Sequence, residues 1–335
     1  MRIIIDTLGS DAGYAEIVSG VLRACDKTDS NFLLIGPEQE IRDLIQASDV
    51  SLDRFEFIDT REYINNEDEP VKSIRRKKDS STVLGLNKLN EEAYDGFISA
   101  GSTGALLAGA LFITKRIDNI ERAILSAALP SRKGPTIFVD TGAVMDSSPH
   151  MQEQFALMGS IYAQKVLNIK EPKVYLLNVG VEEGKGDMKA KKVYELLKEN
   201  PRINFQGNIE SRDILSGKAD VIVTDGFAGN ILIKGVEGIV SLLFSEIKAG
   251  ILSSFKAKLG GLLLKDTFKQ IAKNYNYKEI GAVMLLGVKK PIFKAHGSSD
   301  AKAIMNAILT SEKIMKTNII ENIEEEFKND RGKSN

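Results

Sequence analysis

The sequence predicts an α/β protein built on a doubly wound, mainly parallel sheet. Two observations point to it: short apolar runs alternate with segments of helical periodicity, and several of those runs are apolar at every position. Fully apolar runs are typical of strands covered by helices on both faces, and the alternation is typical of parallel strands joined by helices. No low-complexity linker divides the chain, so we expect a single α/β unit over residues 1–317.

The expected elements follow the chain in order. Strands are predicted at seven apolar runs: 2–6, 31–36, 54–59, 95–100, 136–140, 174–180 and 220–226. Helices are predicted where the period changes to that of a helix: 14–26, 82–92, 103–114, 151–167, 188–199 and 227–258. A further strand-like run leads into Lys294, and a helix is expected to start near Asp300.

An amphipathic helical insertion is predicted over residues 240–276. Gly260 and Gly261 interrupt it, so we expect a hairpin of two helices. Between residues 247 and 273 there are six lysines against the single acid Asp266, and apolar side chains fill much of the rest, including Ile251, Phe255, Leu259, Leu263 and Phe268. Such basic amphipathic helices lie on anionic membranes, but they also pack across dimer interfaces, and the sequence leaves both interpretations open.

Composition narrows the class of function. The 335 residues carry a formal net charge of −1, which argues against a nucleic-acid binder that neutralises many phosphates. The single cysteine, Cys25, cannot form an intrachain disulfide, which fits a reducing cytoplasm. The N-terminus resembles a strand rather than a signal peptide, and no run of about 18 uncharged apolar residues predicts a spanning helix. The charged tail, residues 318–335, is expected to fray from about Ile320.

Four glycine-rich loops follow predicted strands: DTLGSD (6–11), SAGSTGAL (99–106), VGVEEGKGD (179–187) and DGFAGN (225–230). Ligands of open α/β sheets bind at the carboxyl ends of strands, and glycine lets backbone N–H groups approach an anion closely. None of the loops matches the ATP or dinucleotide fingerprints. We expect an anion on one rim of the sheet, held by Asp6, Gly9, Gly101, Ser102, Thr103, Gly104, Gly184, Gly186, Asp225, Gly226 and Gly229.

Three side chains are the catalytic candidates. Lys185 stands between two glycines and could neutralise an anion, although surface lysines are often only solvated. Asn230 could donate its amide hydrogen to a ligand or serve as a helix N-cap. His296 precedes Ser298 and Ser299 before a predicted helix, so this turn is either a second anion site or a capped helix start.

Other chemistries find little support. The chain has no G-x-S-x-G elbow, and Cys25 falls in the first helical pattern, so neither predicts a nucleophile. The two histidines are far apart in sequence and no cysteine cluster exists, so we expect no metal site and no cofactor. A small anion, acting as nucleophile or ligand, is the remaining interpretation.

The loops are embedded in longer segments that occur in a recognisable order. They include PVKSIRRKKDSS (70–81), FISAGSTGALLAGALF (97–112), QFALMGSIYA (154–163), NFQGNIESRDILSGKADVIVTDGFAGN (204–230) and KAHGSSDAKAI (294–304). With DTLGSD and EEGKG, they resemble the acyl-carrier protein (ACP)-dependent phosphate acyltransferase family, PlsX, of bacterial phospholipid synthesis. The resemblance covers about residues 1–317.

The resemblance implies both a fold and a reaction. The fold would be similar to that of the isocitrate/isopropylmalate dehydrogenases, without their nicotinamide or metal. Fatty acyl-ACP and orthophosphate would give acyl phosphate and free carrier protein. Lys185 would neutralise phosphate, Asn230 would donate to the thioester carbonyl oxygen, and His296 with Ser298 would line the cleft beside the departing sulfur.

The resemblance also implies partners and a location. The protein would be a homodimer that docks peripherally on the inner face of the cell membrane and passes its product to a membrane glycerol-phosphate acyltransferase. Three alternatives stay open: a phosphotransacetylase-type enzyme acting on acyl-CoA, an NAD-dependent decarboxylating dehydrogenase, and a catalytically impaired paralogue with a regulatory role. The last is suggested by two departures from the family pattern: DTLGSDAGY in the first loop and Val144 in DTGAV. Ser102 in the second loop is a further departure.

Overall fold

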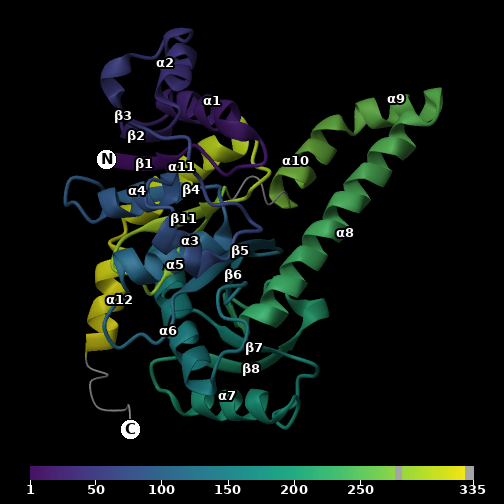
Figure 1. Cartoon of the computed structure of the whole chain (residues 1–335). Coiled ribbons are helices and arrows are strands. Elements are labelled where there is room, and N and C mark those ends of the chain that lie inside the picture. The colour runs from purple at the N-terminus through teal and green to yellow at the C-terminus, as the bar shows by residue number, and fades with distance from the viewer. Residues whose placement is uncertain (276–280, 329–335) are drawn as a thin grey trace.

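A computed structural model describes residues 1–275 and 281–328 of the chain (Figure 1). It has an eleven-stranded sheet of order β3-β2-β1-β4-β11-β10-β5-β6-β9-β7-β8. Most neighbouring strands pair in parallel, while β10 pairs antiparallel with β11 and β5, and β5 pairs antiparallel with β6. The predicted α/β class with a mainly parallel sheet is confirmed.

All seven predicted strands are present, and four more complete the sheet. The strands are β1 (Arg2–Asp6), β2 (Asn31–Gly36), β3 (Phe55–Asp59), β4 (Gly96–Ser99), β5 (Ile124–Ser131), β6 (Gly134–Val139), β7 (Val174–Asn178), β8 (Phe205–Glu210), β9 (Val221–Val223), β10 (Ala282–Leu286) and β11 (Ile292–Ala295). Of the four, β11 is the strand-like run expected before the His296 turn, and β5, β8 and β10 were not predicted.

The helices lie on both faces of the sheet. They are α1 (Gly13–Cys25), α2 (Glu38–Gln46), α3 (Pro70–Arg76), α4 (Ser81–Leu89), α5 (Thr103–Gly109), α6 (Pro149–Val166), α7 (Met188–Glu199), α8 (Gly226–Leu252), α9 (Phe255–Leu263), α10 (Lys265–Tyr275), α11 (Ala301–Met315) and α12 (Ile319–Lys328). A π-helical stretch, Ala110–Thr114, continues α5. Each helix predicted from periodicity has its counterpart here.

Alternation along the strands explains the two helical layers. In β1, Ile3 and Ile5 belong to the cluster that contains α1, α6 and α11, whereas Ile4 belongs to the opposite cluster with α4 and α5. All three isoleucines are at most 1% exposed. Successive side chains of a strand point to opposite faces, so a strand with an apolar residue at every position must be covered on both sides.

The antiparallel strands reverse the direction of half the sheet. Because β10 and β5 each pair antiparallel with both of their neighbours, β6, β9, β7 and β8 run opposite to β1, β4 and β11. The expectation that all four glycine-rich loops share one rim is therefore wrong. The loops after β1, β4 and β11 form one group, and those after β6, β9 and β7 form another.

The helical insertion breaks at a different place from the one predicted. The helix α8 ends at Leu252, and Ser254 caps α9 by accepting a hydrogen bond from the Ala257 N–H. Gly260 and Gly261 lie inside α9 rather than between two helices. Figure 1 shows α8 leading away from the sheet, with α9 and α10 returning toward it.

Length and composition alone would let α8 cross a membrane, because the helix has 27 residues and its most apolar window has a mean hydropathy of 1.5. Only 6% of that window is buried. The sequence predicted no such helix. The first turns of α8 line the cavity described below, so this part of the helix belongs to the α/β unit.

The C-terminal segment does not fray at Ile320. Residues Ile319–Lys328 form α12, which contacts α6. Ile319, Ile320, Ile323 and Phe327 are buried, because they recur at helical spacing on one face. The α/β unit thus extends beyond the predicted boundary at 317, and residues 329–335 of the predicted tail lie outside the described part of the chain.

Candidate active site

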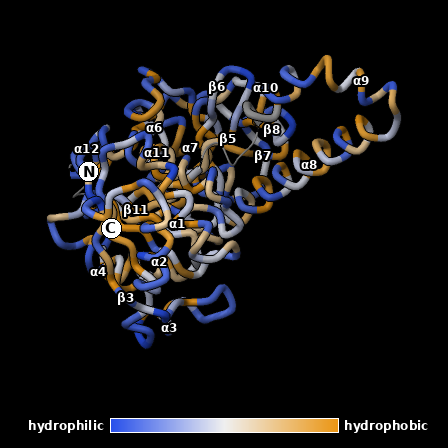
Figure 2. Tube along the Cα trace, turned by 90° about the horizontal axis from the view of Figure 1, so that it is seen from above, coloured by the Kyte–Doolittle hydropathy of each residue, from blue (hydrophilic) through white to orange (hydrophobic). Residues whose placement is uncertain are grey.

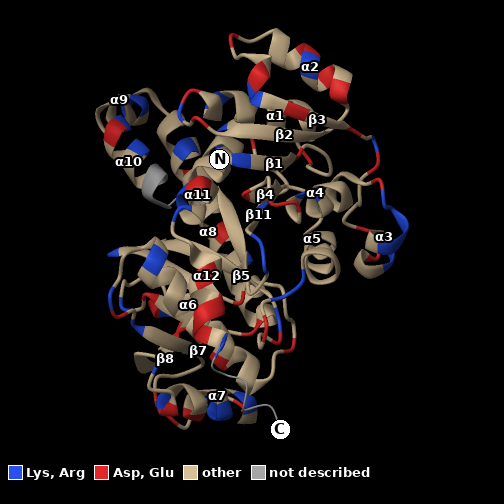
Figure 3. Ribbon diagram, turned by 90° about the vertical axis from the view of Figure 1, so that its left-hand side faces the viewer, with Lys and Arg blue, Asp and Glu red and all other residues tan. Residues whose placement is uncertain are grey.

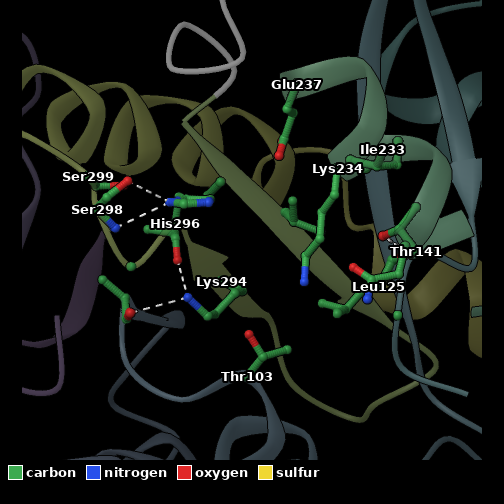
Figure 4. A pocket seen from close by; sticks show the side chains of 18 of the residues that line it. Thr103, Leu125, Thr141, Ile233, Lys234, Glu237, Lys294, His296, Ser298 and Ser299 are labelled. Carbon is green, nitrogen blue, oxygen red and sulfur yellow. Dashed lines mark hydrogen bonds between the residues drawn. The ribbon is translucent and has the colours of Figure 1, made fainter. Parts of the chain in front are cut away.

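A cavity of about 550 Å³ lies where β4, β11, β10, β5 and β6 meet the first turns of α8 (Figure 4). Seven of the predicted site residues line it: Gly101, Thr103, Gly104, Asn230, His296, Ser298 and Ser299. Nine others do not: Asp6, Gly9, Ser102, Gly184, Lys185, Gly186, Asp225, Gly226 and Gly229. The cavity therefore joins the second loop, the fourth loop and the His296 turn.

The turn around His296 leads directly into the capped N-terminus of α11. Asp300 is the N-cap of α11 and accepts a hydrogen bond from the Ala303 N–H, as the sequence predicts. The Ser298 N–H donates to the His296 Nδ1 atom at 3.2 Å, and the Ser298 hydroxyl lies 2.9 Å from the same atom. Because a backbone N–H can only donate, Nδ1 accepts, and in the neutral ring the proton is on Nε2.

The first loop packs against this turn and reaches the cavity through Asp11. The Asp11 N–H and the Ser10 hydroxyl both donate to the Gly297 carbonyl oxygen, at 3.0 and 2.9 Å. Gly9 has a φ of 73°, and a Cβ there would lie 3.1 Å from the Gly101 Cα. Glycine at position 9 thus lets two loops that are distant in sequence touch.

Asp6 does not line the cavity but holds the second loop, which does. Its carboxylate accepts hydrogen bonds from the Ser99 hydroxyl (2.8 Å), the Thr82 hydroxyl (3.0 Å) and the Leu8 N–H (3.1 Å). Burial raises the pKa of Asp6, and these hydrogen bonds oppose the shift. Ser99 also accepts from the Gly101 N–H, so Asp6 fixes the second loop without facing the ligand space.

Lys294 is the most perturbed group in the cavity. It lies on β11 opposite Ser99 of β4, and its ammonium group donates to the carbonyl oxygens of Ala100 (3.2 Å) and Ala295. Burial lowers the pKa of Lys294 to about 8, although the fields of Asp6 and Asp11 oppose the shift. Perturbed lysines in cavities are typical of functional sites.

The helix α8 contributes one polar face. Asn230, Lys234 and Glu237 all line the cavity, because residues three and four positions apart share a helix face. Asp225, not Asn230, is the N-cap, since its carboxylate accepts from the Ala228 N–H at 2.8 Å. The N-cap interpretation of Asn230 is therefore wrong, and among the described residues its amide has no hydrogen-bond partner.

Two glycines at the start of α8 serve close packing. A Cβ on Gly229 would lie 2.1 Å from the Asp140 carbonyl oxygen, and a Cβ on Gly226 would lie 2.6 Å from the Asp140 carboxylate. Asp140 in turn accepts hydrogen bonds from the N–H groups of Leu125, Thr141, Ala143 and Val144. These glycines position α8 against the loop after β6, so their predicted contact with an anion is not observed.

Lys185 lies outside the cavity. Its loop follows β7, which stands two places beyond β6 in the sheet, and neighbouring strands are about 4.8 Å apart. The Lys185 side chain is 50% exposed, with its ammonium group 3.9 Å from the Glu182 carboxylate. Of the three catalytic candidates, Asn230 and His296 line this cavity, and Lys185 does not.

Part of the cavity wall is apolar. Leu125, Ala127 and Leu129 alternate along β5 and so face the same side, and Ile233 and Val283 complete the surface. A cavity with both charged groups and apolar surface suits a ligand that is itself both anionic and apolar.

Sequence reasoning missed Lys294, Lys234 and Glu237. Lys294 belongs to the quoted KAHGSSD segment and stands between buried Phe293 and Ala295, which is the one signal that could have marked it. Lys234 follows Asn230 by four positions, the spacing of one helix face. His150 pairs with Glu153 at 3.0 Å on α6 and does not line the cavity. The described residues contain no group of three or more potential metal ligands.

Known proteins resemble the chain over nearly its whole length. Residues 1–322 match the family described as "Fatty acid synthesis protein". Proteins named phosphate acyltransferase from Clostridium tetani and Alkaliphilus oremlandii are 45% and 46% identical to it, over 98% and 97% of both chains. Among solved structures, EutD phosphotransacetylase from Staphylococcus aureus covers 94% of both chains with a TM-score of 0.60 at 17% identity.

A second structural neighbour is more distant. The 4-hydroxythreonine-4-phosphate dehydrogenase from Klebsiella pneumoniae gives a TM-score of 0.52 at 14% identity, over 94% of this chain and 99% of its own. At such identities the two structures establish only a shared α/β fold with a large, mostly parallel sheet. The full-length sequence matches are much stronger, and on them the chain belongs to the PlsX family of phosphate acyltransferases.

Proposed function

We propose that this enzyme transfers a fatty acyl group from ACP to inorganic phosphate, giving acyl phosphate for phospholipid synthesis. A phosphate oxygen attacks the thioester carbonyl carbon and forms the new C–O bond. The C–S bond then breaks, and the sulfur leaves with the electron pair as a thiolate. The protein has to position phosphate beside the carbonyl and to stabilise the oxyanion that forms there.

The observation that carries the proposal is the cavity with both charged and apolar lining in a member of this family. Lys294 and Lys234 supply positive charge, while Leu125, Ala127 and Leu129 supply apolar surface for the acyl chain. Asn230 has an amide without a partner among the described residues and is the proposed donor to the carbonyl oxygen. His296 is the proposed proton donor to the departing thiolate through Nε2.

The phosphotransacetylase alternative is not favoured. Relatives that are 42–46% identical over nearly the full length are named phosphate acyltransferase, whereas the phosphotransacetylase neighbour is 17% identical. The NAD-dependent dehydrogenase has equally weak support, because the dehydrogenase neighbour is 14% identical.

The deciding experiment offers the purified protein two acyl donors. Labelled phosphate is incubated with palmitoyl-ACP or palmitoyl-CoA, and the labelled acyl phosphate is separated from free phosphate and quantified. We expect phosphate-dependent product from acyl-ACP. Product from acyl-CoA alone would favour the phosphotransacetylase alternative, and no product from either donor would favour the impaired, regulatory paralogue.

A role for Lys185 stays a prediction that the same assay tests. Its loop is tied to the start of α8, because Lys189 of α7 forms an ion pair with Asp225 at 3.3 Å. Lys185→Ala is expected to abolish acyl phosphate formation if the loop takes part in turnover. Unchanged turnover would remove Lys185 from the reaction.

The carrier protein is proposed to dock beside the second loop. The helix α3 presents exposed Lys72, Arg75 and Arg76 (Figure 3). At its start, Pro70 lies close to Gly104 of the cavity, with 2.7 Å between the Pro70 Cγ and a Cβ built on Gly104. A basic surface next to the cavity suits a partner of negative charge.

The proposed dimer and membrane contacts involve the surfaces of α8 and α9. We propose a homodimer that contacts the inner face of the cell membrane peripherally from the cytoplasm and delivers acyl phosphate to a membrane glycerol-phosphate acyltransferase. Apolar residues along α8 and α9, which project from the rest of the molecule in Figure 2, support both surfaces. On α8, exposed Ile239, Leu242 and Leu243 suit a second copy of the chain.

On α9, Phe255 and Leu263 are 82% and 81% exposed beside Lys256 and Lys258, which suits an anionic membrane. We also propose that the fold is of the isocitrate/isopropylmalate dehydrogenase type with a helical hairpin inserted. The dehydrogenase neighbour and the return of α9 and α10 toward the sheet support this assignment.

A further inference from the structure

Lys294 is a partly buried lysine whose ammonium group no carboxylate pairs with at short range. Its ammonium group donates to two backbone carbonyl oxygens, those of Ala100 and Ala295. In the described parts of the chain it forms no ion pair, and Asp6 and Asp11 influence it only through their fields. Buried charges in proteins are normally paired, so the arrangement is complete only when an anion enters the cavity.

Lys234 brings a second ammonium group to the same space. Figure 4 shows its side chain extending from α8 into the region that Lys294 and Thr103 border. Among the described residues no ion pair is formed by Lys234. The one carboxylate on this face of α8 is Glu237, and burial raises its pKa, which opposes the negative charge that it would bring.

Neutral donors surround the two cations. The hydroxyl groups of Thr103, Ser298 and Ser299 belong to the cavity lining. A tetrahedral oxyanion needs several donors from different directions, and lysine contributes to such a site as a point charge. The apolar residues of β5 offer no such donor, so an anion held by these groups leaves those residues free for an acyl chain.

We infer that inorganic phosphate binds between the ammonium groups of Lys294 and Lys234, with the Thr103 hydroxyl as a further donor. The inference rests on the proposed function, in which phosphate is the acyl acceptor. Two ammonium groups match the two negative charges of the phosphate dianion. The site does not require Lys185, whose ammonium group lies outside the cavity.

The test is the binding of inorganic phosphate alone to the purified full-length chain, by isothermal titration calorimetry at pH 7. Lys294→Met and Lys234→Met are each expected to weaken phosphate affinity about 10- to 100-fold, the loss typical of one charge-assisted hydrogen bond. Lys192→Met is the matched control, because Lys192 is an exposed lysine of α7 that pairs with Glu195. The Lys192→Met variant should bind phosphate with the same affinity as the wild type. Circular dichroism and thermal unfolding check that each variant is folded.

Two results would overturn the inference: wild-type phosphate affinity in a folded Lys234→Met or Lys294→Met variant, or no phosphate binding by the wild type. Lys234→Met decides alone if Lys294→Met does not fold, because Lys234 is exposed. These outcomes differ from the outcome that would contradict the proposed function. A wild-type protein that binds phosphate through these lysines but forms no acyl phosphate contradicts the reaction and leaves the phosphate site standing.

Discussion

The ammonium group of Lys294 donates a hydrogen bond of 3.2 Å to the carbonyl oxygen of Ala100. This contact joins the end of β11 to the turn after β4, where Lys294 is in register with Ser99. Ser99 in turn donates to the buried carboxylate of Asp6. The lysine is thus held by backbone groups and not by an ion pair, and for that reason burial dominates its protonation.

Phosphate affinity is expected to fall above about pH 8. Burial lowers the pKa of Lys294 to about 8, so the free protein loses this charge as the pH rises through that value, whereas an ordinary lysine keeps its charge to about pH 10. The dissociation constant for phosphate should therefore rise by up to about tenfold for each pH unit above 8. Calorimetric titrations between pH 7.5 and 9.5 measure this slope.

Lys294→Arg is the control for that slope. Arginine stays protonated throughout this range, so a folded Lys294→Arg variant that binds phosphate should show a flat profile. An equally steep profile in the variant would assign the pH dependence to another group facing the cavity. The other titratable groups that face the cavity are Asp11, Lys234, Glu237 and His296. Asp6 of β1 acts on Lys294 through its field from outside the cavity.

Gly229→Ala is expected to destabilise the protein. The new methyl group would lie 2.1 Å from the Asp140 carbonyl oxygen, so α8 or the loop after β6 has to move. Overpacking of this kind costs about 1–3 kcal/mol of unfolding free energy, measured by urea denaturation. Gly184→Ala is the matched control, because a Cβ there meets nothing within 4 Å. Equal stabilities for the two variants would contradict the close packing of α8.

Seven strands could be predicted because helices cover both faces of the sheet. A strand such as β1 is apolar along most of its length, and such a short apolar run is typical of a strand that is buried on both faces. The strand β8 was missed because it lies at the edge of the sheet and reads FQGNIE, with polar residues at alternate positions. β5 was missed because its sequence, ILSAALPS, contains alanine and proline, which are depleted in strands. The pairing of β5 with β10 joins segments that are distant in sequence, and local pattern does not encode such a contact.

The reversal of strand direction at β10 and β5 explains why the site was predicted only in part. Loop composition identified Gly101, Thr103, Asn230 and His296, which do meet. It placed Lys185 with them because all four strands were assumed to end on one rim. Lys294 escaped notice because a lysine in a strand is usually solvated on one face, and only the tertiary structure shows that its ammonium group turns toward the Ala100 carbonyl oxygen.

Phe327→Ala is expected to lower the unfolding free energy by about 3–5 kcal/mol, the usual cost of removing a fully buried aromatic ring. Phe327 is 0% exposed, and its helix α12 contacts α6. Thermal and urea unfolding measure the effect. Glu325→Ala changes an exposed residue of the same helix and should leave stability within about 0.5 kcal/mol. A small effect of Phe327→Ala would restore the original prediction of a frayed tail.

Leu263→Glu is expected to reduce binding to vesicles that contain anionic lipid. Leu263 is 81% exposed on α9, so the substitution should not disturb the fold. It removes apolar surface and adds a negative charge, and both changes oppose docking on an anionic membrane. Co-sedimentation with anionic and with neutral liposomes measures the loss. Leu44→Glu makes the same chemical change on α2 and should bind as the wild type does. If both variants bind equally well, α9 serves the dimer and not the membrane.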